Sequence, residues 1–234
     1  MKIALLPGDA RQTILGELLR ADGFDVLPYA PGLAADAYLF PLPTGSHPAL
    51  AALPHNALAL TALAQGRYPH LRLRDYFAVE AVQTANAAIT AETALTVAQT
   101  HRDRVLCGSE VLLLGFGRIG QALAPRLRAL GAAVTVYARR SESRALALGM
   151  GCHVLASLPE RIQGFDLVFN TIPAPILPVV PDCTTIELAS APGGFRDASG
   201  IVPAPGLPGK LAPRSAAEAL HDSVLDILRK EGHA

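Results

Sequence analysis

Hydrophobic and polar positions along this chain follow two periods, one typical of buried strands and one typical of amphipathic helices. Short apolar runs, such as KIALL at 2–6 and EVLLLG at 110–115, predict buried strands. Between such runs, apolar residues recur at helical spacing, as in ARQTILGELLRADG at 10–23. Strands that alternate with helices in this way predict parallel sheets and an α/β architecture.

The periodicity divides the chain into two regions. In the first, we expect strands at 2–6, 24–29, 37–43 and 57–63 and a helix at 10–23 that Gly23 closes. The pattern weakens between 66 and 85, and we place a domain boundary there. A helix is then predicted at 90–102, with Thr90 as its N-cap and Glu92 in its first turn. Such a helix is suited to linking two domains.

From residue 110 onwards the pattern is clearer. We expect strands at 110–115, 133–139, 152–155, 165–170, 184–189 and 200–204, and helices at 118–131, 142–149 and about 213–230. Ala217, Leu220, Val224, Ile227 and Leu228 form an apolar stripe on the last helix, so we expect one of its faces to be buried.

Composition excludes several classes of protein. The chain has 234 residues, of which half are hydrophobic, and 20 basic residues balance 20 acidic ones. Zero net charge predicts no binding to nucleic acid or to an anionic membrane. Three isolated cysteines predict neither a disulfide framework nor a metal site. The first apolar run is too short for a signal peptide and no stretch is long enough to span a membrane, so we expect a cytoplasmic protein.

Gly115, Gly117 and Gly120 form a GxGxxG pattern directly after a predicted strand and at the start of a predicted helix. In that context the first glycine permits a tight turn, the second lets the backbone approach a pyrophosphate, and the third lets the helix pack close to the strand. The helix N-terminus, with Arg118 and Ile119, then offers N–H groups to the phosphates. A tight turn without a ligand is the alternative.

The end of the next strand indicates which dinucleotide is bound. NAD-specific sites carry an acidic residue there, which accepts hydrogen bonds from the ribose. This chain has Arg139, Arg140 and Ser141, and its first acid is Glu142. A guanidinium can bind a 2′-phosphate through paired hydrogen bonds, so we expect NADP. The alternative is a solvated arginine pair.

Two later strand ends should reach the same edge of the sheet, where ligands of open α/β sheets bind. Asn170, Thr171, Ile172 and Pro173 follow one strand, and Ala189 and Ser190 follow the next. We expect these residues at the nicotinamide half of the cofactor. In the first region, Arg11 follows the first strand and is a candidate for binding an anionic substrate.

These patterns predict an α/β protein with a Rossmann-type doubly wound parallel sheet and a second, smaller flavodoxin-like domain. The expected organisation is a substrate-side domain at 1–85, a linking helix at 86–104, a dinucleotide-binding domain at 105–212, and a C-terminal helix at 213–234 that packs back towards the first domain. We expect the glycine-rich turn to lie at a cleft between the two domains.

Several motifs together resemble the A subunits of dipicolinate synthases. They are GDARQ at 8–12, the segment 113–139 with the glycine-rich turn, NTIPAPIL at 170–177, ELASAPGGFRD at 187–197 and APGLPGKLAPRSA at 204–216. The resemblance is strongest from Asn86 to Leu228. It implies the fold of the D-2-hydroxyacid and alanine dehydrogenases, and NADP-dependent oxidation of dihydrodipicolinate, or of its hydroxy-tetrahydro precursor, to dipicolinate in sporulation. It also implies a partner protein, a flavoprotein-like B subunit.

The implied substrate is a small ring with two carboxylates, which require cationic or N–H donors in a partly dry site. We expect Asp9, Arg11, Thr44, Ser190, Lys210 and Arg214 to contact it. The first domain is shorter than is usual in these subunits, which affects the substrate half more than the cofactor half. We also expect a homo-oligomer.

Two other functions stay open. A D-2-hydroxyacid dehydrogenase needs a histidine acid/base just before the last helix, but Arg214 stands there. A non-catalytic NADP-binding partner protein fits the lack of an evident acid/base residue. The sequence identifies no catalytic residue.

Overall fold

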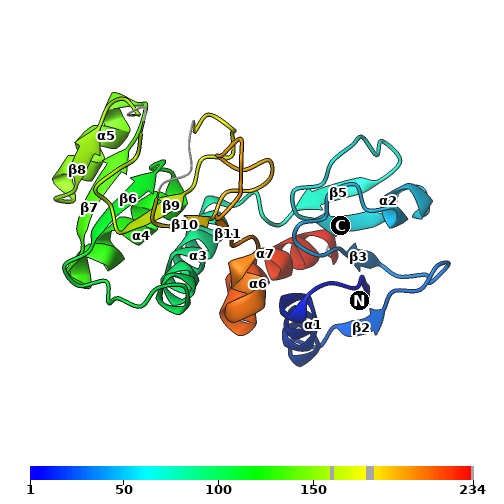
Figure 1. Ribbon diagram of the computed structural model, residues 1–234. Helices are drawn as coiled ribbons and strands as arrows, with labels where there is room; N and C mark the ends of the chain where they lie inside the picture. Colours follow the sequence, from blue (N-terminus) through cyan, green and yellow to red (C-terminus); the bar gives the residue numbers. More distant parts are fainter. Residues whose placement is uncertain (159–160, 178–181, 233–234) are drawn as a thin grey trace. The chain divides into compact units, whose positions relative to one another are not determined.

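The computed structural model describes residues 1–158, 161–177 and 182–232 of the chain (Figure 1). The chain divides into two compact units. The first comprises Met1–Asn86 with Pro208–Ala234, and the second comprises Ala87–Leu207. Each unit is built on one parallel sheet, so the α/β fold class that the sequence predicts is confirmed.

The first unit has a five-stranded parallel sheet. Its strands are β1 (Lys2–Leu5), β2 (Asp25–Pro28), β3 (Ala37–Leu39), β4 (Leu58–Thr61) and β5 (Arg72–Asp75). They are ordered β2-β1-β3-β4-β5. This is the strand order of flavodoxin-like folds, in which ligands bind beyond the carboxyl ends of the strands.

Helices and buried side chains cover both faces of this sheet. The helices are α1 (Ala10–Ala21), α2 (Ala49–Ala52) and α7 (Pro213–Gly232). Side chains alternate between the faces along each strand: Ile3 packs in the cluster that includes α1 and α7, whereas Ala4 packs in the cluster that includes α2. The apolar stripe predicted on α7 is buried in the first cluster, and α7 lies against α1.

Strand β5 was not predicted, because its sequence Arg-Leu-Arg-Asp lacks the apolar run of a buried strand. It is the edge strand, where charged side chains are tolerated. Arg72 and Arg74 form ion pairs of 3.2 and 2.6 Å with Glu231 of α7. The strand is therefore stabilised by charges that only the tertiary structure brings together.

The second unit has a six-stranded parallel sheet. Its strands are β6 (Glu110–Leu114), β7 (Ala133–Tyr137), β8 (His153–Leu155), β9 (Leu167–Asn170), β10 (Thr184–Glu187) and β11 (Val202–Pro203). They are ordered β11-β10-β9-β6-β7-β8. If β6 is counted as strand 1 and the sheet is followed from β8 to β11, this is the order 3-2-1-4-5-6 of dinucleotide-binding sheets. The strand order reverses its direction beside β6.

One face of this sheet packs against helices. They are α3 (Glu80–Thr100), α4 (Arg118–Ala129) and α5 (Ser141–Gly149), and Val111 and Leu113 of β6 point towards them. Leu112 and Leu114 point to the other face, where they meet Ile162, Leu177 and Phe195 from loop segments. The short helix α6 (Leu207–Leu211) follows the last strand.

The predicted start of the linking helix is wrong. Helix α3 begins at Glu80, and Thr90 is a buried residue in its interior instead of an N-cap. Its residues are almost all small or weakly polar, so no apolar stripe marks where it begins. The division between the two units falls within this helix, after Asn86.

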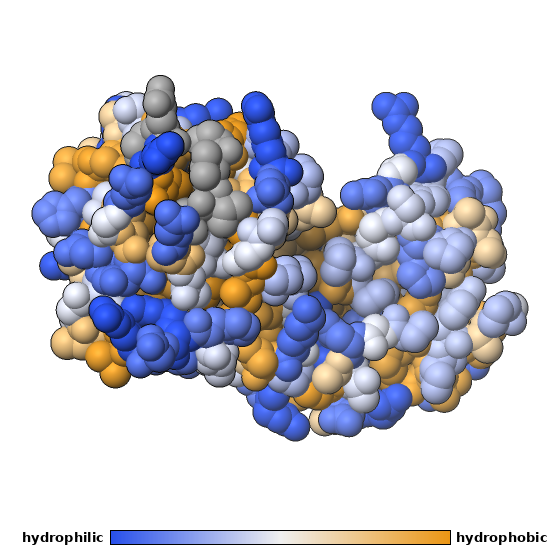
Figure 2. Space-filling view, viewed as in Figure 1, coloured by the Kyte–Doolittle hydropathy of each residue, from blue (hydrophilic) through white to orange (hydrophobic). Residues whose placement is uncertain are grey.

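The visible surface of both units intersperses hydrophilic with hydrophobic residues (Figure 2). Hydrophobic residues are prominent over α5, where Leu146 and Leu148 are exposed. No helix in the described part of the chain is both long and apolar enough to cross a membrane.

Candidate functional site

A pocket of about 560 Å³ opens at the carboxyl edge of the second unit's sheet. Three segments meet in it: the turn between β6 and α4, the end of β7 with the start of α5, and the loop after β9. The lining residues are Gly115, Phe116, Gly117, Tyr137, Ala138, Arg139, Arg140, Ser143, Thr171, Ile172 and Pro173. The pocket thus lies beside β6, at the point where the strand order reverses and ligands of such sheets bind.

The three glycines of the turn have distinct roles. Gly115 has φ +94°, which favours glycine, and an added Cβ would collide with the Thr171 hydroxyl. A Cβ on Gly120 would lie 2.6 Å from the carbonyl oxygen of Gly115. A Cβ on Gly117 would have no described atom within 4 Å. The chain's own packing therefore requires Gly115 and Gly120, whereas the space beside Gly117 is available to a ligand.

Gly117 is also the N-cap of α4. It has no side chain to cap the helix, and the first-turn N–H groups of a helix lack intrahelical acceptors. The first intrahelical bond runs from the Gln121 N–H to the Gly117 carbonyl, at 2.9 Å. The helix start thus offers main-chain donors and a partial positive charge to an anion at the pocket.

The end of β7 carries two exposed arginines into the pocket lining, Arg139 and Arg140. Arg144, one turn into α5, donates from Nη1 to the carbonyls of Ala138 and Arg139, at 3.0 and 2.6 Å. These bonds fix the backbone of the turn from which Arg139 extends. Ser143 lines the pocket as well, whereas Ser141 is the exposed first residue of α5.

At the opposite side of the pocket, Thr171, Ile172 and Pro173 form the lining. The Thr171 backbone N–H and hydroxyl both donate to the Leu114 carbonyl, at 2.8 and 2.9 Å, which ties this loop to the glycine-rich turn. Asn170 is fully buried, and its amide bonds to the chain itself.

The other predicted cofactor residues lie around the pocket without lining it. Ile119 and Gly120 pack into the start of α4, where Gly120 is buried, and Arg118 is exposed. The Ala189 N–H donates to Glu187, and Ser190 is exposed in the following loop. Phe116, Tyr137, Ala138 and Ser143 were not predicted. The first three occupy strand ends and the turn, so position relative to the glycines was a signal that could have identified them.

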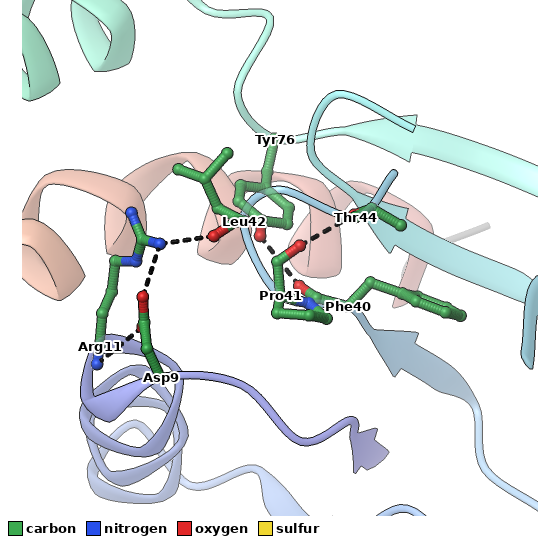
Figure 3. A network of polar contacts seen from close by, with 7 residues as sticks. All are labelled: Asp9, Arg11, Phe40, Pro41, Leu42, Thr44 and Tyr76. Carbon is green, nitrogen blue, oxygen red and sulfur yellow. Dashed lines mark hydrogen bonds and ion pairs between the residues drawn. The ribbon is translucent and has the colours of Figure 1, made fainter. Parts of the chain in front are cut away.

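In the first unit, the predicted substrate residues Asp9, which is exposed, and Arg11, which is buried, belong to one network of polar contacts (Figure 3). Arg11 Nη2 donates to Asp9 Oδ2 at 3.0 Å and to the Leu42 carbonyl at 2.5 Å, and the Arg11 side chain is only 7% exposed. Asp9 Oδ1 also caps α1 by accepting from the Arg11 N–H at 3.1 Å. Asp9 therefore holds the guanidinium at the start of the helix.

Thr44 and Tyr76 complete this network (Figure 3). The Thr44 hydroxyl donates to the Pro41 carbonyl at 2.9 Å and accepts from the Ala62 N–H at 2.8 Å. The Tyr76 hydroxyl donates to the Phe40 carbonyl at 2.9 Å. Burial raises the pKa of Tyr76, so this hydroxyl stays protonated. Both hydroxyls use their hydrogen on the chain and thereby stabilise the loop after β3.

The remaining predicted substrate residues are more open to solvent. Lys210 is exposed in α6. Arg214, in the first turn of α7, has a side chain that is 65% exposed, with Glu218 4.0 Å away. This contact does not restrict the Arg214 side chain strongly, because exposed ion pairs of this length stabilise little.

Cys152, which is buried, and Cys183, which is partly buried, are not activated. Burial raises the pKa of the Cys183 thiol to about 11 and also raises that of Cys152. Both thiols are therefore protonated near neutral pH, and neither supplies a nucleophilic thiolate.

Comparisons with known proteins agree with this geometry. Residues 77–175 match the NAD-binding domain of D-isomer specific 2-hydroxyacid dehydrogenases. The whole chain superposes on L-alanine dehydrogenase with a TM-score of 0.68 at 18% identity, covering 100% of this chain and 90% of that one. The chain thus has the fold of nicotinamide-dependent dehydrogenases, and its second unit is of the nicotinamide-binding type.

The resemblance of this chain to the A subunits of dipicolinate synthases, inferred from the motifs, is confirmed. The chain is 33% identical over 171 residues to the A subunit of dipicolinate synthase from Bacillus subtilis, an alignment that covers 67% of this chain. It spans 58% of the length of that relative. The crystal structure of the A chain of dipicolinate synthase from Bacillus subtilis superposes with a TM-score of 0.83 at 24% identity, covering 100% of this chain and 97% of that one.

Proposed function

We propose that this chain, which resembles the A subunits of dipicolinate synthases and has the fold of nicotinamide-dependent dehydrogenases, is an NADP-dependent oxidoreductase that forms dipicolinate in sporulation. The observation that carries the proposal is the pocket of the second unit, which is lined both by a glycine turn with an open Gly117 and by two exposed arginines. Such a pocket matches a dinucleotide with an additional phosphate on its ribose.

The residues present fit the proposed cofactor. The pyrophosphate would lie at Gly115 and Gly117 and at the N–H groups of Arg118, Ile119 and Gly120. Arg139 and Arg140, with Ser141 and Ser143 in the first turn of α5, would bind the 2′-phosphate. The nicotinamide half would lie at Asn170, Thr171, Ile172 and Pro173 and at Ala189 and Ser190. When bound, NADP supplies hydride-accepting chemistry at its nicotinamide ring.

NADP is favoured over NAD by the charge at the end of β7. An acid at this position would repel a 2′-phosphate, but Arg139 and Arg140 stand there, and Arg144 holds the turn that presents them. Guanidinium groups bind phosphate oxygens in pairs, with bonds stronger than those between neutral groups.

The proposed substrate is a cyclic dicarboxylate, dihydrodipicolinate or its hydroxy-tetrahydro precursor. Arg11, Lys210 and Arg214 are cations of the first unit that can pair with its carboxylates, and Ser190 is a neutral donor. Asp9 accepts hydrogen bonds only, so we assign it to holding Arg11. Thr44 supports the neighbouring loop through its two bonds.

The proposed reaction requires the protein mainly to position the substrate against the cofactor. Oxidation of dihydrodipicolinate removes a hydride and a proton from the ring, and the hydroxy-tetrahydro precursor must in addition lose water. In both cases the gain of aromaticity favours the product. The chain's residues would hold both carboxylates, orient the ring and keep water away. A protein that only positions the substrate is compatible with the lack of an evident acid/base residue in the sequence.

The family match at 77–175 favours a second candidate, a D-2-hydroxyacid dehydrogenase. That reaction needs a histidine as acid/base near the start of the last helix. Arg214 occupies that position, and His221, further along α7, lies 2.6 Å from Asp22 at the end of α1. We therefore rank this function below dipicolinate formation.

The proposal is tested by turnover. The purified chain is mixed with NADP⁺ and freshly prepared precursor, with and without the flavoprotein-like B subunit, and dipicolinate is followed by its ultraviolet absorbance. Formation of dipicolinate with NADPH in equal amount supports the proposal. NADP binding without turnover in either mixture would favour a non-catalytic partner protein. Turnover of 2-hydroxy acids instead would favour the dehydrogenase.

A further inference from the structure

A partly buried side-chain pair joins the loop after β9, which lines the pocket, to the loop after β10. Asn170 and Glu187 are the last residues of β9 and β10 and are register partners in the sheet. Asn170 Nδ2 donates to Glu187 Oε1 at 2.7 Å. Each strand end leads directly into one loop, so this bond ties the starts of both loops together.

Each member of the pair also holds its own loop. Asn170 Oδ1 accepts from the Ile172 N–H, and Nδ2 donates to the Ile172 carbonyl, both at 3.1 Å. Glu187 Oε1 accepts from the Ala189 N–H and Oε2 from the Gly194 N–H, both at 2.9 Å. The carboxylate thus spans the loop from its beginning to its far side.

The glycines of the second loop make room for the pair. A Cβ on Gly194 would collide with the Asn170 amide, and a Cβ on Gly193, which has φ +82°, would lie 3.0 Å from Glu187 Oε2. Asn170 is fully buried, so an unmet donor or acceptor there would be strongly unfavourable. With these bonds the network admits one arrangement of the two loops.

We propose that Asn170 and Glu187 are positioning residues for the nicotinamide half of the cofactor. They hold Ile172, Pro173 and the loop at 189–194 in the one arrangement that places the nicotinamide ring. Three hydrogen bonds occupy the Glu187 carboxylate, so its role is to organise the loops and not to exchange protons with substrate. This inference rests on the proposed function of the pocket.

The structure separates this role from binding of the adenosine half. Gly117, Arg139 and Arg140 lie on β6–α4 and β7–α5, and the bonds of the Asn170–Glu187 pair reach neither segment. Disturbing the pair should therefore weaken contacts of the nicotinamide half while the adenosine half still binds.

The experiment compares two probes on the full chain: NADPH, followed by the fluorescence of its nicotinamide, and 2′,5′-ADP, which carries only the adenosine half. In Asn170→Asp, two carboxylates face each other across the 2.7 Å contact. In Glu187→Gln, the new amide N–H group faces one of the N–H donors that the carboxylate accepted in the native chain. We expect each to weaken NADPH binding at least about tenfold and to reduce its fluorescence enhancement, with 2′,5′-ADP affinity within about twofold of native.

The double variant sharpens the test. In Asn170→Asp with Glu187→Gln, the new amide can donate to the new carboxylate, so NADPH binding should recover part of what Asn170→Asp alone loses. Asp166→Asn is the matched control, since Asp166 accepts the Glu110 N–H at 2.9 Å at the opposite end of β9 and should leave both probes unaffected.

Three results would overturn the inference: parallel loss of NADPH and 2′,5′-ADP binding, an additive loss in the double variant, or failure of all three variants to fold. Parallel loss or misfolding would assign the pair to folding, and an additive loss would show that the two residues do not act together. Failure of the native chain to bind either probe would instead refute the proposed function itself.

Discussion

The carboxyl edges of the two sheets are built in opposite ways. At the edge of the second unit, the glycine-rich turn, the end of β7 and the loop after β9 line an open pocket, and a Cβ on Gly117 would meet no described atom within 4 Å. At the edge of the first unit, polar side chains bond to the chain itself: Arg11 to Leu42, Thr44 to Pro41, and Tyr76 to Phe40. The glycine-rich turn of the second unit leaves main-chain donors for a ligand, whereas these side chains of the first unit bond to their own loops.

This difference follows from what each edge is proposed to bind. A pyrophosphate is recognised by main-chain N–H groups at a helix start, which it approaches closely where a glycine leaves space. Carboxylates on a small ring need charged side chains whose positions are fixed before the substrate binds. The hydrogen bonds of Arg11 fix its side chain in this way. Substitutions at the two edges should therefore affect cofactor and substrate separately.

The largest effect is expected at the arginines of the cofactor edge. Arg139→Asp removes a charge-assisted bond of about 1.5–3 kcal/mol and adds a repulsive charge, so the preference for NADPH over NADH should shift by at least about 100-fold and reverse. Titration with both cofactors measures it. Arg104→Asp, at the exposed opposite edge of the same sheet, is the control. An unchanged ratio of affinities would show that Arg139 does not face the 2′-phosphate.

The glycines should divide into ligand-binding and structural positions. Gly117→Ala should weaken NADPH and NADH equally, by about tenfold or more, without lowering the melting temperature, because the added methyl meets only the ligand. Gly120→Ala should instead destabilise the fold by about 1–3 kcal/mol, because its Cβ would lie 2.6 Å from the Gly115 carbonyl.

Binding titrations and thermal unfolding of both glycine variants test this division. Gly149→Ala, at the end of α5 with no described atom within 4 Å of its Cβ, is the control. A Gly117→Ala protein that binds cofactor normally would mean that no phosphate approaches this turn.

At the edge of the first unit, Arg11→Ala and Arg214→Ala should each reduce kcat/KM for the precursor at least about tenfold, equivalent to about 1.4 kcal/mol. NADP affinity should stay nearly unchanged. Arg11→Ala should also destabilise the fold, because it removes a buried side chain and its hydrogen bond to the Leu42 carbonyl, whereas Arg214 is 65% exposed and its loss should not.

Arg229→Ala, an exposed change in the last turn of the same helix α7, is the control for Arg214→Ala. Equal kcat/KM values for the Arg214 and Arg229 variants would remove Arg214 from the substrate site.

The smallest effect concerns the pH dependence of the buried network. Burial raises the pKa of Tyr76, so its stabilising contribution is complete below about pH 10, where an unfolded tyrosine ionises, and is lost as the pH rises further. Urea unfolding between about pH 8 and 11 should show a decline of up to about 1.4 kcal/mol per pH unit from this residue. Tyr76→Phe should lose about 1 kcal/mol at pH 8 and flatten the decline. An equally steep decline in the variant would assign it to other groups.

Much of the fold could be predicted from local sequence. Apolar runs identified the strands of both sheets except β5, and GxGxxG placed the turn between β6 and α4. The features that escaped prediction depend on distant residues. Strand β5 relies on Glu231 of α7 for its ion pairs, and α3 begins at Glu80 in a segment of small residues without an apolar stripe.

The site was predictable in outline but not in its bonding. Strand ends and glycines indicated the pocket, because parallel strands bring their carboxyl ends to one edge. The sequence did not reveal that Asn170 bonds to Glu187, that Asp9 holds Arg11, or that Thr44 donates to Pro41. Such bonds depend on side-chain directions across strands and loops, which local patterns do not encode.

The central claim is that the pocket beside Gly117 binds NADP(H). It is tested most directly by titrating the native chain with NADPH and with NADH while following nicotinamide fluorescence, and then adding 2′,5′-ADP as competitor. We predict that NADPH binds at least about tenfold more tightly than NADH and that 2′,5′-ADP displaces it. Equal affinity for the two cofactors, or NADPH that 2′,5′-ADP does not displace, would contradict the claim.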